Sequence, residues 1–149
     1  MEQQDGFNIG GRAYVARDYY IYEEDFLAAD LIAGATVNGS IEIQADSDFV
    51  WQKGAFFADL AGEPQTSDSM VVPLVALQLI DTGSGRNLFE LPVPIPSSFG
   101  SGQLPFVLPI PRLFFARSTI QVQVTNFSDD TPYNLRLSFI GYKAYPQGF

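Results

Sequence analysis

The sequence from Leu113 to Tyr145 is LFFARSTIQVQVTNFSDDTPYNLRLSFIGYKAY. Two runs in it alternate between apolar and polar residues; their apolar members are Ile120, Val122 and Val124, then Leu135, Leu137 and Phe139. Successive side chains of a strand point to opposite faces, so each run predicts a strand with one buried face. The linker 126–132, NFSDDTP, is rich in turn formers. We therefore expect an antiparallel hairpin whose buried face is covered by the rest of the chain.

The composition is that of a small acidic globular protein. The chain has 149 residues, which suits one domain, and 46% of them are hydrophobic, which is enough for a core. Its 13 Phe and 7 Tyr favour pleated, half-buried surfaces. Seventeen acidic residues against eight basic ones give a net charge of −9, which repels phosphate backbones. Direct binding to nucleic acid is therefore not expected.

Several kinds of chemistry are excluded by residue type. The chain has no Cys, so it has no thiolate nucleophile or Cys-ligated metal, and it has no His, so a Ser-His-Asp triad is impossible. It also contains no G-x-S-x-G motif and no D-x-D-x-D-G calcium loop. We expect no enzymatic activity and no cofactor.

Further strands are predicted before the C-terminal third. The segments with alternating or β-branched and aromatic residues are Arg12–Tyr22, Thr36–Ala45, Phe49–Leu60, Met70–Asp81 and Asn87–Leu91. The run Phe26–Ala33 is ambiguous between helix and strand, and we assign it to a strand. Glu23 to Asp25 is expected to be an acidic turn, Asn38-Gly39 a turn or bulge, and Gly54 a bulge or bend.

These elements predict an all-β fold. About eight strands joined by frequent turns are typical of an antiparallel β-sandwich, jelly roll or barrel. We divide the chain into a flexible N-terminal arm, residues 1–11, and a single β-sandwich domain, residues 12–149. Six of the ten prolines lie within 92–111, so this segment is expected to be extended, close to polyproline II, along an edge or surface. It is either a structural connection or a partner-binding arm.

Two residue groups allow functional alternatives. The clustered acids are typical of solvated turns, although carboxylate pairs also occur in the active sites of glycosidases and in calcium sites. These acids are residues 23–25 with Asp30, Asp46 with Asp48, and Asp129 with Asp130. Trp51 and the tyrosines fit a core or interface, although such rings can also stack on sugars in a carbohydrate- or receptor-binding module.

The C-terminal segment resembles the ends of small all-β virion proteins of tailed bacteriophages. The resemblance rests on an R-S-x-I-x-V-x-x-x-N strand followed by a Y-N-[LI]-R-L-[ST]-F-x-G-x-K strand. The matching residues are Arg117, Ser118, Ile120, Val122, Asn126, Tyr133, Asn134, Leu135, Arg136, Leu137, Phe139, Gly141 and Lys143.

The resemblance implies a non-enzymatic structural role in the virion. It favours a capsid decoration (cement) protein that binds the outer shell and bridges neighbouring capsid subunits, with a neck or tail protein as the alternative. The implied partners are the major capsid protein and the chain itself, as a homotrimer. The N-terminus is unlike a signal peptide and no run reaches the ~20 apolar residues of a membrane helix, so synthesis in the host cytoplasm and no membrane contact are expected.

Contacts to such partners are expected in two arms, residues 1–20 and 92–111, because extended arms can add to neighbouring sheets. The candidate contact residues are Tyr14, Tyr19, Tyr20, Pro94, Pro96, Phe99, Pro109 and Pro111.

Overall fold

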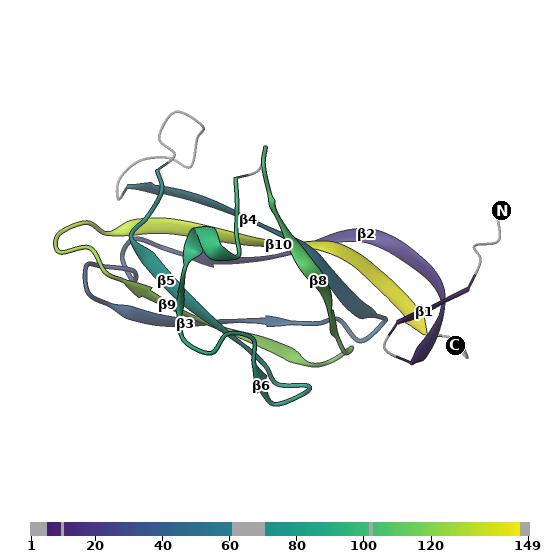
Figure 1. Cartoon of the computed structure of the whole chain (residues 1–149). Helices are drawn as coiled ribbons and strands as arrows, with labels where there is room; N and C mark the ends of the chain where they lie inside the picture. Colours follow the sequence, from purple (N-terminus) through teal and green to yellow (C-terminus); the bar gives the residue numbers. More distant parts are fainter. Residues whose placement is uncertain (1–5, 10, 61–70, 102, 147–149) are drawn as a thin grey trace.

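The protein is a β-sandwich made of two antiparallel sheets that face each other (Figure 1). The structure is a computed structural model and describes residues 6–9, 11–60, 71–101 and 103–146. These described residues contain ten strands and no α-helix. The predicted all-β sandwich is confirmed, with ten strands where the sequence predicts about eight.

The two sheets take strands from distant parts of the chain. Sheet A consists, in order across the sheet, of β1 (Phe7–Ile9), β2 (Arg12–Phe26), β10 (Tyr133–Pro146), β4 (Asp48–Leu60) and β8 (Phe106–Phe114). Sheet B consists, in order, of β3 (Thr36–Glu42), β9 (Thr119–Asn126), β5 (Val75–Asp81) and β6 (Arg86–Asn87), and β7 (Val93–Pro94) also pairs with β5. A single turn of 3₁₀ helix, η2, spans Ile95–Ser97.

The core lies between the sheets, and the apolar rows of β9 and β10 supply much of it. All six predicted inward residues of these two strands are buried. Trp51 is buried among them; its ring lies 4.9 Å from that of Phe139 and 5.6 Å from that of Phe99. The predicted buried faces are therefore confirmed, as is the core-filling role of Trp51.

The predicted hairpin between these two strands is wrong. β9 belongs to sheet B and β10 to sheet A, so the linker crosses from one sheet to the other as an arch. Asn126 holds this arch: its Nδ2 donates to the carbonyl oxygens of Leu31 (3.2 Å) and Thr131 (2.8 Å), and its Oδ1 accepts from the Ser128 amide (2.9 Å). Each of the two strands thus pairs with other neighbours and contributes its apolar face from the opposite side of the core.

β10 lies at the centre of sheet A, between β2 and β4. β2 continues through 23–25, where the sequence predicts a turn, because Asp25 pairs with Arg136 of β10 on the outer face. Beyond Phe26 the predicted strand Phe26–Ala33 is wrong. Residues 27–35 form turns, in which the Leu31 amide donates to the Leu27 carbonyl (2.9 Å).

Two glycines predicted as irregularities have other roles. Asn38-Gly39 lies in a regular stretch of β3, paired without a shift to Gln123 and Val122, so no turn or bulge occurs there. The bulge in β4 lies at Gln52, between the pairs of Trp51 and Lys53, two residues before the predicted position. At Gly54 a Cβ would overlap the Ser98 carbonyl oxygen, so glycine allows the η2 segment to approach β4.

The arm and the proline-rich segment are more ordered than expected. Residues 7–9, assigned to the flexible arm, form β1 and pair with β2. The proline-rich segment is not extended throughout, because η2 interrupts it and buries Ile95; Pro96 fits this first helical turn, where no amide hydrogen is needed. β5 begins at Val75, so Pro73 lies before the strand, where the sequence predicts a strand over Met70–Asp81, and the return strand is limited to Arg86–Asn87. Residues 1–5 and 61–70, which include Met70 of the predicted strand Met70–Asp81, lie outside the described residues.

Candidate functional site

The most distinctive surface feature is an outward bulge of β8, an edge strand of sheet A. β8 pairs with β4 at both ends, Val107 with Lys53 and Arg112 with Trp51. Residues 108–111 therefore stand opposite Gln52 alone and have no ladder partner there. Pro109 and Pro111 fall within this bulge, where their missing amide hydrogens cost no ladder bond.

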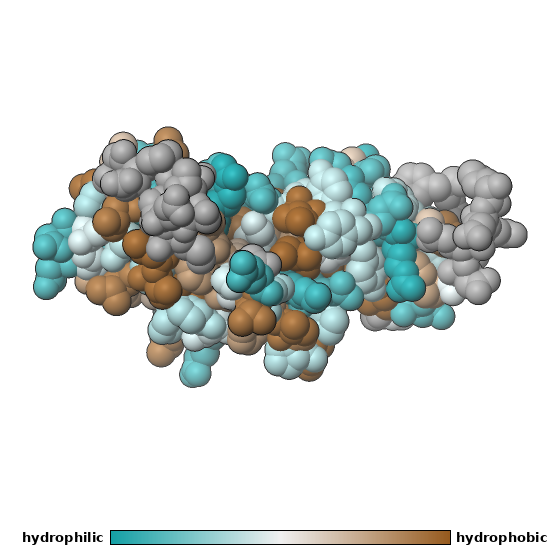
Figure 2. Space-filling view, turned by 90° about the horizontal axis from the view of Figure 1, so that it is seen from above, coloured by the Kyte–Doolittle hydropathy of each residue, from teal (hydrophilic) through white to brown (hydrophobic). Residues whose placement is uncertain are grey.

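The bulge and Val107, which precedes it, carry exposed apolar side chains. Leu108 is half-buried against the core, whereas Ile110 is 82% exposed and Val107 is 62% exposed. Figure 2, a view from above, shows hydrophobic residues in several places among hydrophilic ones on this face of the molecule. We call Val107, Pro109, Ile110 and Pro111 the β8 prong. An exposed apolar prong on an edge strand is typical of a contact surface.

The prong is also held in shape by its sequence. Each proline ring fixes its own φ, and Pro111 restricts Ile110, which precedes it. A contact made by Ile110 therefore costs less conformational entropy than one made by a flexible loop. The chemistry available at this site is apolar insertion into a partner's pocket.

The predicted contact residues divide into exposed and buried ones. Pro94, Pro96, Pro109, Pro111 and Tyr19 are exposed, and Tyr20 is half-buried. Pro94 belongs to sheet B and Pro109 to sheet A.

Tyr14 and Phe99 are not available to a partner, which corrects their assignment as contacts. Tyr14 is 1% exposed and Phe99 is 0% exposed. The Phe99 ring packs on Trp51 and lies 5.3 Å from that of Phe139. The Tyr14 hydroxyl donates a hydrogen bond to Asp48.

The sequence prediction missed Ile110 and Val107 although it named the prolines beside Ile110. The signal was present in LPIP: the two prolines that flank the isoleucine have no amide hydrogen, so a regular ladder is interrupted there. Such a side chain is displayed unless another element covers it.

Asp48 is the centre of a buried polar cluster at the start of β4. Its carboxylate accepts from the Tyr14 hydroxyl (2.7 Å), the Arg12 guanidinium (2.9 Å) and the Ala116 amide (2.8 Å). Arg12 also lies over the Phe115 ring, 4.5 Å from its centroid. The cluster ties the start of β2 to the turn after β8, and it leaves Asp48 engaged rather than free to serve as a base.

Burial, and then the hydrogen bond to Asp48, raises the pKa of Tyr14 to about 12. Because the folded pKa exceeds the ordinary value of 10.0, the unfolded chain loses this proton first as the pH rises. The stabilising contribution is complete below pH 10 and is lost between pH 10 and about 12. We expect wild type to lose stability relative to Tyr14→Phe over this window, by up to about 1 kcal/mol for each pH unit. Urea unfolding of both proteins across that range checks this, and parallel profiles would contradict it.

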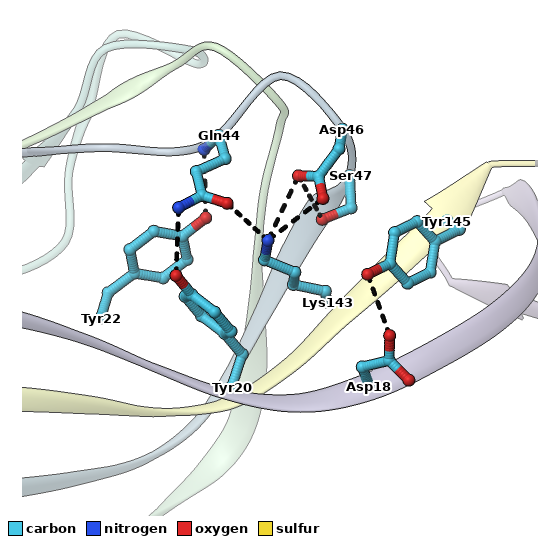
Figure 3. A network of polar contacts seen from close by, with 8 residues as sticks. All are labelled: Asp18, Tyr20, Tyr22, Gln44, Asp46, Ser47, Lys143 and Tyr145. Atoms are coloured by element: carbon cyan, nitrogen blue, oxygen red, sulfur yellow. Dashed lines mark hydrogen bonds and ion pairs between the residues drawn. The ribbon is translucent and has the colours of Figure 1, made fainter.

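A second polar network surrounds Lys143, which is 6% exposed (Figure 3). Its Nζ donates to Gln44 Oε1 (2.6 Å) and pairs with Asp46 (3.2 Å), and it lies 4.3 Å from the centroid of the Tyr20 ring. Gln44 in turn donates to the Tyr20 hydroxyl (3.0 Å). The network joins β10 to the segment between β3 and β4, so Lys143 is a structural tie between the sheets.

The other polar residues of the C-terminal motif also hold the fold together. Asn134 accepts from the Ala28 amide and donates to Asp59, both at 2.8 Å. Arg136 makes two hydrogen bonds to Asp25, at 2.6 and 3.1 Å. The motif therefore specifies an arch and a central strand, and it carries no reactive group.

The structure offers little support for a glycosidase or calcium site built from the clustered acids, or for a sugar-binding surface built on Trp51. Buried Trp51 cannot stack on a sugar. Asp46 pairs with Lys143 while Asp48 pairs with Arg12, so the two acids serve different clusters. Within 6–9, 11–60, 71–101 and 103–146, no group of three or more acids is placed to hold a metal ion. In the same residues, no helix has the length and apolar character needed to cross a membrane.

Neither a scan against models of known protein families nor a search of curated proteins finds a match for this chain.

Proposed function

We propose that the chain is a non-enzymatic structural protein of a bacteriophage virion, a decoration protein that binds the outer capsid surface. In this proposal the sandwich is of the jelly-roll type, and the protein is made in the host cytoplasm and assembles as a homotrimer. Its partner is the major capsid protein, whose neighbouring subunits it bridges. Residues Arg117 to Lys143 support the proposal through their resemblance to such proteins.

The observation that carries the proposal is the β8 prong. Its apolar side chains are exposed in a protein that is otherwise strongly acidic, and the two prolines hold them in a fixed shape. Fully desolvated apolar anchors of this kind dominate binding at protein interfaces. A decoration protein needs such an anchor and needs no reactive group.

Sedimentation tests the proposal directly. The purified chain is run alone and then mixed with undecorated shells of the major capsid protein of its own virus. We expect a discrete oligomer, and co-sedimentation with the shells. A stable monomer that does not bind the shells would contradict the proposal.

The prong is tested by Ile110→Asp. The side chain is 82% exposed, so folding should be little affected, whereas a charge placed in an apolar pocket should weaken shell binding by about thirtyfold or more. Phe127→Asp, at an exposed residue in the linker between β9 and β10, is the matched control and should bind as wild type. Equal binding by both variants would show that the prong is not the anchor.

A further inference from the structure

The outer face of sheet B contains an uncharged hollow of about 570 Å³. Its lining residues come from three neighbouring strands; they are Asn38, Gly39, Ser40, Ile80, Gln121 and Gln123. No member of this lining is ionisable, although the chain carries a net charge of −9. Its volume lies in the range of ordinary ligand sites.

The register of the strands places the polar side chains side by side. Asn38 of β3 stands opposite Gln123 of β9, and Ser40 stands opposite Gln121. Directly opposed residues on one face have Cβ atoms about 5 Å apart. Two rows of hydrogen-bonding groups therefore cross the hollow, and Ile80, opposite Gln121 on β5, adds an apolar contact.

These side chains are not used by the fold. Among the described residues, the side-chain amides of Asn38, Gln121 and Gln123 have no hydrogen-bond partner, and all three are exposed. Gln78, opposite Gln123 on β5, shows the contrast: it is buried, and its amide donates to the Phe89 carbonyl (2.8 Å) and accepts from the Phe89 amide (3.3 Å). The hollow thus displays three free amides beside one that holds a neighbouring segment.

We infer that this hollow binds a neutral oligosaccharide. A side-chain amide both donates and accepts hydrogen bonds, as does each sugar hydroxyl, so the two chemistries match group by group. Because the lining has no cation, it offers no ion pair to phosphate or to an acidic glycan. Ile80 can contact the C–H face of a sugar ring. This inference does not depend on the proposed role of the β8 prong.

A second copy of the chain suits the hollow less well. A twofold interface places the same surface patch against itself, and a hollow facing an identical hollow leaves both unfilled. A small polar ligand fills the space without that penalty.

The test is nuclear magnetic resonance of the full chain labelled with ¹⁵N, titrated separately with maltohexaose, cellohexaose and fully N-acetylated chitohexaose, all of which are neutral. We expect saturable shifts of the side-chain amide signals of Asn38, Gln121 and Gln123 with at least one of them. We expect none with an oligogalacturonate, which is anionic. The double variant Gln121→Ala with Gln123→Ala should bind about tenfold more weakly or worse.

Gln52→Ala supplies the matched control. Gln52 is an exposed glutamine on the outer face of sheet A, beside Tyr19 in a second hollow of about 340 Å³, and its loss should leave binding unchanged. Three results would overturn the inference: no saturable shift with any neutral hexasaccharide, shifts that map to Gln52 and Tyr19, or changes of the three amide signals on dilution without sugar. The last result would identify a second copy of the chain as the occupant.

Discussion

The variant Gly141→Ala is expected to lose about 3 kcal/mol or more of its free energy of unfolding. Gly141 lies in β10, at the centre of sheet A, where the pairing with β4 shifts register between Ile140 and Gly141. A Cβ built there would overlap the Val50 carbonyl oxygen. The overlapping atom is backbone of the neighbouring strand, so relief requires the strands to separate. Urea unfolding followed by tryptophan fluorescence measures the loss.

Ser138→Ala is the matched control for this prediction. Ser138 lies in the same strand on the outer face of sheet A, and its hydroxyl makes one exposed hydrogen bond to Glu23 at 3.3 Å. Its removal should change stability by about 0.5 kcal/mol or less. If Gly141→Ala were as stable as Ser138→Ala, the close approach of β10 and β4 would be incorrect.

The second large effect is expected for Asn126→Asp, whose free energy of unfolding should fall by about 3 kcal/mol at neutral pH. The substitution keeps the shape of the side chain but replaces its two donated hydrogens by a charged oxygen. That oxygen would face the carbonyl oxygens of Leu31 and Thr131 in a residue that is 0% exposed. The arch between the sheets would then hold an unpaired buried charge.

The pH dependence of this variant gives the prediction a distinctive signature. Burial and the facing carbonyls should raise the folded-state pKa of the introduced carboxyl above its unfolded value of about 3.9. The protonated form, which can donate one hydrogen bond, is favoured in the folded state. The deficit relative to wild type should therefore be smallest below about pH 4 and should grow as the pH rises through the raised pKa.

Asn38→Asp is the control for this second prediction. Asn38 is exposed on the outer face of sheet B, so the same chemical change should cost little at any pH. Denaturant unfolding of wild type and both variants at several pH values provides the comparison. A deficit of Asn126→Asp that is independent of pH would show that the introduced carboxyl does not titrate in a buried site.

The sequence predicts buried faces better than strand neighbours. The alternation in 119–126 and 133–140 correctly shows which side chains face the core, because the alternation of side chains between the two faces is a property of each strand alone. Alternation carries no information on the pairing partner, so the predicted hairpin joins two strands that lie in different sheets. Asn126, at the end of β9, is the residue whose buried side-chain amide holds the arch in place of a hairpin turn.

The candidate site was predicted only in part, for a related reason. The prolines indicated where a regular ladder must fail, and Pro109 and Pro111 do lie in the bulge of β8. Phe99 was misassigned because the sequence does not show that Gly54 lets its segment approach the core. The hollow on sheet B was not predicted at all, because amides on an outer strand face are indistinguishable from ordinary solvated residues until register places them side by side.

The central position of β10 has a consequence for synthesis on the ribosome. The strand that joins β2 to β4 is the last of the described strands to be made, and β2 is among the first. Until residues 133–146 have left the exit tunnel, β2 and β4 have no common neighbour, and both present apolar faces and open edges. Sheet A therefore closes only once β10 is available to pair with both β2 and β4, by contacts between residues far apart in the sequence, which is a slow class of folding event. In that interval the open edges and apolar faces favour aggregation, which the net charge of −9 opposes.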